Sequence, residues 1–310
     1  MTARLLQLSG MVVDLVYSVD KVPKAGHEAV VNEHSIHPGG GFNAMVAAKR
    51  AGMDVSYGGA LGTGPFARIV EQGLLSEAIP SLRPRLADRD QGCCSVMIDR
   101  SGERTFLTGD GAEGYATVDD VKTVSAPGFE WTLLSGYSLY YQGSRQAMVA
   151  WLNGDAPIAN LVFDPSPMVS AISHGAMAAA LARATWISAN VHEAATLTGF
   201  DTPLKSAKAL AQTVPSNGGV VVRDGQNGCV IATADVCKAI PPFPVMPIDT
   251  NGAGDTHLGS FIARLAAGDD PIEAARYANV AAALSTTRRG PATAPDAADV
   301  INAMTRKEAS

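Results

Sequence analysis

The sequence predicts an α/β fold in which helices cover a mainly parallel sheet, with a small second β sheet beside it. Short apolar runs alternate with helical stretches along most of the chain, which is the pattern of βαβ units. The chain has 310 residues, of which 46% are hydrophobic and 17% charged, so it can bury a large core. Because no linker divides it, we expect a single domain over residues 1–310.

The N-terminal elements follow from the spacing of apolar and small residues. Residues 5–16 are predicted to form one buried strand followed by a turn, because the apolar run is too short for a helix. Residues 28–37 alternate as a second strand. The segment PGGGFNAMVAAKRAG predicts a glycine turn and then an Ala-rich helix that ends at Gly52. A short strand at 55–60 follows.

A hairpin is predicted at 93–108, where two β-prone runs flank a polar turn at Ser101-Gly102. Together with the strand at 28–37 it is expected to form a small β lid over about 26–38 and 92–109. The strands of the main sheet are assigned to apolar runs at 131–134, 161–163, 186–188 and 220–222, with a further strand ending near 233.

The C-terminal third contains two predicted helices. A proline-rich segment at 241–247 cannot be helical and is expected to be extended. A glycine turn then opens a long helix, and a second Ala-rich helix runs from Pro271 to about Ser285.

Composition excludes several classes of function. The formal net charge is −6 and the longest basic tract is Arg288-Arg289, so we expect no nucleic-acid partner. The N-terminal apolar stretch is broken by polar residues, so we expect no membrane span and a cytoplasmic location. The four cysteines form no CxxC pair, and with six scattered histidines they offer no zinc spacing.

The segment NGAGD, residues 251–255, is the strongest candidate for chemistry. Small residues at Gly252, Ala253 and Gly254 leave backbone N–H groups uncovered at a helix start, where an anion is favoured. Asp255 lies in the same turn and, with an ordinary pKa of about 3.9, would be ionised and able to accept a proton from a hydroxyl. Phosphoryl transfer needs this combination of anion binding and a carboxylate. The alternative is an ordinary helix start with Asp in its first turn.

Two segments resemble the signatures of the ribokinase-like (PfkB) carbohydrate kinases. DTNGAGDTHLGSF resembles the C-terminal signature, and PGGGFNAMVAAKRAG resembles the N-terminal one. FDPSP at 163–167, NVHE at 190–193, RDGQNG at 223–228 and TRRG at 287–290 extend the resemblance over nearly the whole chain. It implies a ribokinase-like three-layer α/β/α sandwich with a β lid, and transfer of the ATP γ-phosphoryl group to a sugar hydroxyl with Mg²⁺ and sometimes K⁺.

The resemblance also implies roles for individual residues. Asp255 would be the general base, and Gly252, Ala253 and Gly254 the anion hole. The implied sugar contacts are Asp14, Gly39, Gly40 and Asn43. The implied nucleotide contacts are Asn190, Arg223, Gly225, Gly228 and Asn279. Glu193 would hold Mg²⁺ through water, and K⁺ would lie among Asp249, Asn251 and Gly290.

Several alternatives remain open on the sequence. A nucleoside kinase of the same family and a non-catalytic sugar-binding regulator share these motifs. The N-terminal glycine turn, in PGGGFN, lacks the lysine that would favour a phosphosugar acceptor. It is also one residue shorter than in ribokinases, so ribose itself is not implied. Residues 62–67 also fit the GxGxxA pattern of a dinucleotide fold. The edge of the lid sheet makes a homodimer a further prediction.

Overall fold

The structure is a computed structural model that describes residues 2–125, 128–155 and 157–308. Its main sheet contains eight strands: β1 (Arg4–Gln7), β4 (Asp54–Tyr57), β7 (Trp131–Ser135), β8 (Leu161–Asp164), β9 (Trp186–Asn190), β10 (Gly219–Arg223), β11 (Cys229–Thr233) and β12 (Cys237–Ile240). Their order is β12-β11-β10-β9-β8-β7-β1-β4. The six strands from β4 to β10 pair in parallel, and β11 and β12 are antiparallel. The predicted mainly parallel sheet is confirmed.

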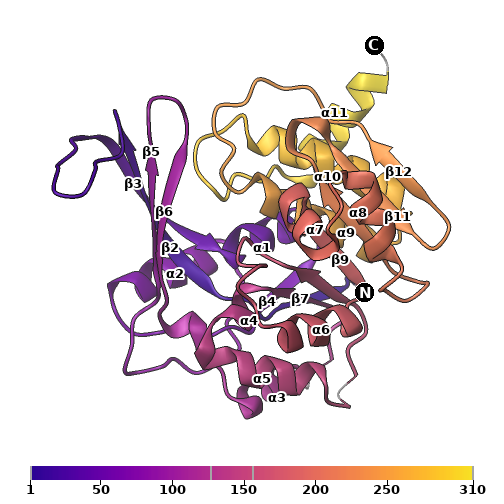
Figure 1. The fold of residues 1–310 in the computed structure, drawn as a ribbon, viewed down its shortest axis with the longest axis horizontal. Helices are drawn as coiled ribbons and strands as arrows, with labels where there is room; N and C mark the ends of the chain where they lie inside the picture. The colour runs from indigo at the N-terminus through magenta and orange to yellow at the C-terminus, as the bar shows by residue number, and fades with distance from the viewer. Residues whose placement is uncertain (1, 126–127, 156, 309–310) are drawn as a thin grey trace.

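Helices cover both faces of this sheet (Figure 1). One face packs against α1 (Gly41–Arg50), α2 (Pro65–Ser76), α9 (Ala253–Ala266) and α10 (Pro271–Ser285). The other packs against α3 (Val118–Ser125), α4 (Tyr137–Tyr140), α5 (Gln142–Leu152), α6 (His174–Arg183), α7 (Val191–Thr198) and α8 (Pro203–Ala211). The last helix, α11 (Ala297–Glu308), packs on α10.

Alternation along each strand produces the two cores. Leu5 and Leu133 point into one core while Leu6 and Leu134 point into the other, because successive side chains of a strand face opposite sides. The result is the predicted three-layer α/β/α sandwich. Within the described residues, no helix is both long and apolar enough to span a bilayer.

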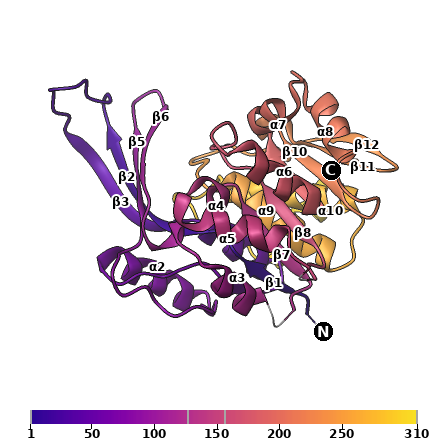
Figure 2. The ribbon, with the colours of Figure 1, turned by 60° about the horizontal axis from the view of Figure 1, so that its bottom comes forward.

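The small sheet contains β2 (Met11–Val19), β3 (Val31–Gly40), β5 (Cys93–Ile98) and β6 (Arg104–Gly109), in the order β3-β2-β5-β6. It stands away from the main body as a lid (Figure 2). The hairpin predicted at 93–108 is confirmed as β5 and β6. Phe106 and Leu107 on the edge strand β6 are more than half exposed; pairing of this edge with a second subunit stays a prediction.

Two sequence predictions differ from the structure. Residues 5–16 form two strands rather than one strand and a turn, because β1 pairs with β4 and β7 while β2 pairs with β3 and β5 in the other sheet. The predicted lid ranges therefore omit β2, one of the two central strands of this sheet. The glycine turn predicted at the start of PGGGFN is not a separate element, because Gly39 and Gly40 end β3 and α1 begins at the next residue.

Candidate active site

The carboxyl ends of three neighbouring parallel strands form the floor of the candidate site. Asp164 ends β8, Asn190 ends β9 and Arg223 ends β10. Because these strands are parallel neighbours, the three side chains emerge at the same edge of the sheet. Open α/β sheets bind ligands at this edge.

The start of α9 lies above this edge. The helix begins after Gly252, which has a φ of 73°, and Gly254 is exposed. The first N–H groups of a helix have no intrahelical acceptor, so this turn offers donors and a positive dipole end to an anion. The anion hole at 252–254 stays a prediction, located at this helix start.

Asp255 is joined directly to α1. Asn43 Nδ2 donates a hydrogen bond of 3.0 Å to Asp255 Oδ2. The two helices approach closely because residue 259 is glycine: a Cβ there would lie 2.1 Å from the backbone oxygen of Ala44. Asn43 is 3% exposed, and within the described residues its Oδ1 has no hydrogen-bond partner. A buried unpaired acceptor beside Asp255 is suited to a ligand hydroxyl.

The pKa of Asp255 is raised to about 6, mainly because burial disfavours the charged carboxylate. The hydrogen bond from Asn43 and the nearby Arg223 guanidinium lower the pKa, while the charge of Asp164 raises it. The sequence-based expectation of an ordinary pKa of about 3.9 is therefore wrong. Near neutral pH the carboxylate is still largely ionised and can accept a proton.

Asp14, on β2, faces Asp255 from the lid side. Its carboxyl is nearly buried, and burial together with the charge of Asp255 raises its pKa to about 7. Gly39 lies against it, since a Cβ at this position would be 2.2 Å from Asp14 Oδ2. The structure thus brings together Asp14, Gly39 and Asn43, all of which were predicted to contact the acceptor. Gly40 follows at the start of α1.

Arg223 is the cation at the centre of the site. Its Nη1 donates to Asp164 Oδ2 at 3.1 Å and also bonds Ser188, and its Nη2 lies 3.5 Å from Glu193 Oε2. Its Nε is 3.7 Å from where a Cβ on Gly254 would be. The guanidinium therefore lies beside the predicted anion hole. Sequence analysis did not assign Asp164 to the site, although its place at a strand end before Pro165 was a usable signal.

Asn190 and Glu193 form a reciprocal cap at the start of α7. Glu193 accepts from Asn190 N at 2.7 Å and from its Nδ2 at 2.8 Å, while Asn190 Oδ1 accepts from Glu193 N at 2.8 Å. Burial raises the pKa of Glu193 to about 7. A carboxylate this enclosed does not fit as a direct metal ligand. Among the described residues, no cluster of three or more His, Cys, Asp or Glu side chains could hold a metal ion.

A second hollow lies near Asn279 on α10. Asn279 Nδ2 donates to the backbone oxygens of Ile240 and Pro241, at 3.3 and 2.9 Å. Its Oδ1 is 3.1 Å from His257 Nε2, so this imidazole nitrogen carries the proton. The hollow has a volume of about 180 Å³ and is lined by Pro241, Pro242, Phe243, Arg276, Asn279, Val280 and Met304.

The loop between β10 and β11 connects this hollow to the anion hole. A Cβ on Gly228 would lie 2.2 Å from the backbone oxygen of Ile240 and 2.8 Å from Pro242 N. The loop begins at Arg223, beside Gly254, and passes Gly225 on its way to Gly228. Four of the five residues predicted to contact a nucleotide, Arg223, Gly225, Gly228 and Asn279, therefore lie along one path from α10 to α9, whereas Asn190 caps α7; their contact with a nucleotide stays a prediction.

The predicted K⁺ residues are close together but are already bonded. Asp249 accepts from Asn251 N at 2.9 Å and from Gly290 N at 3.0 Å. Arg104 Nη2, on the lid strand β6, lies 3.2 Å from Asp249 Oδ1 and donates to Thr250 Oγ1 at 3.0 Å. A carboxylate that holds two N–H groups and a guanidinium does not fit a K⁺ ion. The Arg104 contact instead attaches the lid to the main body.

The GxGxxA segment at 62–67 has a structural explanation. Helix α2 begins after Gly64, and the backbone N–H groups of Phe66 and Ala67 both donate to the Asp90 carboxylate, at 3.1 and 2.8 Å. Because a carboxylate of the chain itself occupies this helix start, it is not available to a dinucleotide phosphate.

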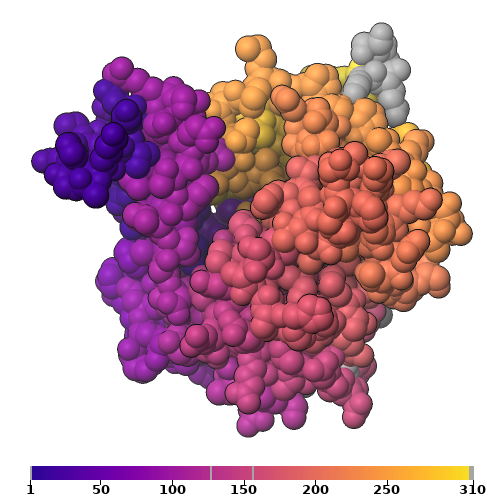
Figure 3. Space-filling view, in the orientation of Figure 1, coloured from indigo at the N-terminus to yellow at the C-terminus, as the bar shows by residue number. Residues whose placement is uncertain are grey.

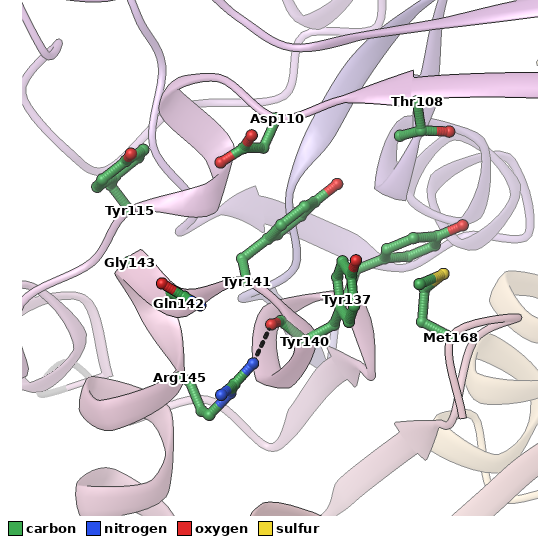
Figure 4. Close-up of a pocket in the computed structure, with 10 residues that line it drawn as sticks. All are labelled: Thr108, Asp110, Tyr115, Tyr137, Tyr140, Tyr141, Gln142, Gly143, Arg145 and Met168. Atoms are coloured by element: carbon green, nitrogen blue, oxygen red, sulfur yellow. Dashed lines mark hydrogen bonds between the residues drawn. The ribbon is translucent and has the colours of Figure 1, made fainter. Parts of the chain in front are cut away.

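A larger cavity of about 500 Å³, here called the tyrosine pocket, opens between the lid and α4–α5. It is lined by Thr108, Asp110, Tyr115, Tyr137, Tyr140, Tyr141, Gln142, Gly143, Arg145 and Met168 (Figure 4). The surface is hollowed between the purple lid strands and the rest of the molecule (Figure 3). Sequence analysis missed this pocket. The signal was the segment GYSLYYQG, with three tyrosines within five residues of a chain that is only 6% aromatic.

Comparisons with known proteins agree with this geometry. The family model described as pfkB family carbohydrate kinase matches residues 4–298. An uncharacterised sugar kinase of Escherichia coli, YegV, is 26% identical over 297 residues, covering 94% of this chain and 90% of the relative. The structure of a ribokinase from Thermotoga maritima has a TM-score of 0.82 at 21% identity, covering 98% of this chain and all of that one. A putative ribokinase II from Escherichia coli, solved with ATP and Mg²⁺, has a TM-score of 0.80 at 20% identity, over 99% and 100% of the two chains.

Proposed function

The chain belongs to the pfkB family of carbohydrate kinases, and we propose that it transfers the γ-phosphoryl group of ATP to a hydroxyl of a sugar acceptor. The observation that carries this proposal is the junction of α1 and α9. There the Asp255 carboxylate, whose pKa is raised to about 6, the buried unpaired amide oxygen of Asn43 and the start of α9 lie next to one another. Proton acceptance, acceptor orientation and anion stabilisation are the three requirements of phosphoryl transfer.

Each group has a defined role in this proposal. Asp14 and Asn43 hold the acceptor hydroxyls, and Asp255 accepts the proton of the reacting hydroxyl as its oxygen forms a bond to the γ-phosphorus. The bond from that phosphorus to the ADP oxygen breaks, and the N–H groups at 252–254 stabilise the charge on the transferred group. Arg223, beside Gly254, adds a fixed positive charge close to the same oxygens.

The nucleotide is proposed to extend from the hollow at Asn279 past Gly228 and Gly225 to the start of α9. Bound Mg²⁺ would neutralise phosphate charge and orient the phosphate oxygens. Because the Glu193 oxygens are enclosed by Asn190 and Arg223, this carboxylate fits such an ion only through water, which Mg²⁺ retains readily. K⁺ is not part of the proposal, since Asp249 is bonded to Arg104.

The proposal is tested by replacing Asp255 and measuring turnover and nucleotide binding separately. Asp255→Asn removes the proton acceptor but keeps size and hydrogen bonding, so we expect turnover to fall by about 10²- to 10⁴-fold while the ATP dissociation constant changes little. Asp270→Asn is the matched control, because Asp270 also begins a helix, α10, through bonds to the N–H groups of Ile272 and Glu273. Undiminished turnover in Asp255→Asn would rule out the mechanism. A non-catalytic regulator would instead bind sugar without releasing ADP in the wild-type protein.

A further inference from the structure

The tyrosine pocket adjoins the proposed acceptor site through a row of side chains across the lid. Asp14 on β2 is paired with Cys94 on β5, and Cys94 is paired with Thr108 on β6. Directly paired residues point to the same face of a sheet, and Thr108 Oγ1 lies 3.3 Å from Cys94 Sγ. The row therefore leads from the carboxylate at the acceptor site to the wall of the pocket, over two strand spacings of about 4.8 Å each.

Tyr137 forms the border between the two spaces. Its ring lines the pocket. The pKa of Tyr137 is raised to about 12, mainly by burial and then by the nearby Cys94, Asp164 and Asp255. Its hydroxyl therefore lies close to the carboxylates of the candidate active site. Tyr137 and Thr108 both line the pocket, and Thr108 is the last residue of the row that starts at Asp14, so the pocket lies next to the proposed acceptor site.

The pocket wall is aromatic. The rings of Tyr137 and Tyr141 are nearly parallel, at 24° and 6.1 Å between centroids, and Tyr140 meets Tyr141 edge-on at 5.6 Å. Figure 4 shows these rings side by side between Asp110 and Met168. On the far side, the Arg89 guanidinium stacks 3.7 Å from the centroid of Tyr115. Such a wall offers ring faces on which a planar ligand can stack.

The polar groups of the pocket suit a ligand with hydrogen-bonding ring atoms. Asp110 follows β6 and presents a carboxylate acceptor, and Gln142 presents both a donor and an acceptor. Arg145 is directed elsewhere, because its guanidinium donates to the backbone oxygens of Leu139 and Tyr140. The pocket thus combines aromatic stacking with a few hydrogen-bonding groups, and its volume of about 500 Å³ lies within the range of small-molecule sites.

We propose that the tyrosine pocket binds a planar heteroaromatic ring attached to the sugar, so that the acceptor of this kinase is a nucleoside. The proposal rests on the proposed kinase function, because the sugar of the nucleoside occupies the site at Asp14 and Asn43. It adds the substrate class: the sugar carries the reacting hydroxyl to Asp255, and the base stacks on the tyrosines and bonds to Asp110 and Gln142.

The first test measures both ADP release and equilibrium binding over matched acceptors. The panel contains ribose and fructose as free sugars, adenosine, inosine, cytidine and uridine as nucleosides, and maltose as a sugar with a second sugar ring in place of a base. We expect a nucleoside to have a kcat/KM at least about ten-fold above that of any free sugar, as base stacking on aromatic side chains implies.

The second test replaces one ring of the pocket. Tyr141→Leu should raise KM for the preferred nucleoside by about ten-fold with little change in KM for ATP, and Tyr141→Phe, which keeps the ring, should restore most of the affinity. The matched control is Tyr17→Leu. Tyr17 lies on the same lid strand as Asp14, β2, but on the opposite face of the lid sheet. Thermal unfolding of each variant verifies that it is folded.

The outcomes separate this inference from the kinase proposal. If nucleosides bind with Tyr141-dependent affinity but no acceptor causes ADP release, the pocket assignment stands and the kinase proposal fails. If free sugars are phosphorylated while nucleosides neither bind nor compete, the kinase proposal stands and this inference is overturned. Preference for maltose, or equal effects of Tyr141→Leu and Tyr17→Leu on nucleoside KM, also overturns it.

Discussion

Removing the hydrogen bond between Asn43 and Asp255 should shift the pH dependence of the reaction. Asn43 Nδ2 donates at 3.0 Å to the carboxylate and so stabilises its charged form. A hydrogen bond to a charged group contributes about 1.5–3 kcal/mol, and one pKa unit corresponds to about 1.4 kcal/mol. In Asn43→Ala the pKa of Asp255 should therefore rise from about 6 by roughly one to two units.

The sign of the effect follows from the proposed role of Asp255 as a base. Protonated Asp255 cannot accept the hydroxyl proton, so activity is lost as pH falls through its pKa. The acidic limb of kcat/KM should thus move from about pH 6 in the wild type to about pH 7–8 in Asn43→Ala. Because Asp14 also titrates near 7, the comparison uses the difference between the two profiles rather than either midpoint.

The assay is ADP release measured from pH 5 to pH 9 at low acceptor concentration. Asn160→Ala is the control, since its Nδ2 makes a bond of similar length, 2.9 Å, to the Glu130 backbone oxygen away from the site. A profile for Asn43→Ala that is scaled down in height but has an unmoved acidic limb would refute the argument that this bond sets the pKa of Asp255.

Two further predictions concern stability and the lid. Because burial raises the folded-state pKa of Asp14 from 3.8 to about 7, wild-type stability falls as pH rises through this window. Above pH 7, Asp14→Asn should therefore be more stable than the wild type by about 4 kcal/mol and melt at a higher temperature, with little difference near pH 4. Equal melting temperatures at pH 8 would contradict this. Arg104→Gln removes the contacts of the lid with Asp249 and Thr250, and should raise ADP release in the absence of acceptor about five-fold. Arg100→Gln, which breaks the exposed ion pair with Asp20 at the same hairpin, should not change this rate. Identical rates in the two variants would contradict the lid attachment.

The main sheet was predictable because each parallel strand carries its own signal. The strands β7, β8, β9 and β10 are buried on both faces and appear as short apolar runs, and the crossover helices between them enforce parallel pairing. The lid was harder. Only three residues separate β2 from β1, and long-range pairing alone decides that the chain changes sheets at Ser9-Gly10.

The site residues on glycine motifs were predictable, whereas those brought in by packing were not. The 252–255 turn is local, so the helix start and its Asp255 carboxylate follow from the sequence. The placement of Asn43 on Asp255 depends on α1 and α9 touching at Gly259, 216 positions from Asn43 along the chain. Arg223 was expected to contact a nucleotide, but its bonds to Asp164 and Glu193 come from the order of the strands.

Asp255 shows why a local argument gave the wrong pKa. A carboxylate in the first turn of a helix is stabilised by the dipole by about 0.3–1 kcal/mol, which would lower its pKa by less than one unit. Burial against α1 and the neighbouring Asp164 act in the opposite direction and raise the pKa to about 6. Because a weak carboxylate base with an ordinary pKa would gain little from accepting a hydroxyl proton, the raised value favours catalysis near neutral pH. The same burial that destabilises the charged carboxylate would thus make Asp255 a stronger base in the proposed reaction, while the bond from Asn43 favours its ionised form.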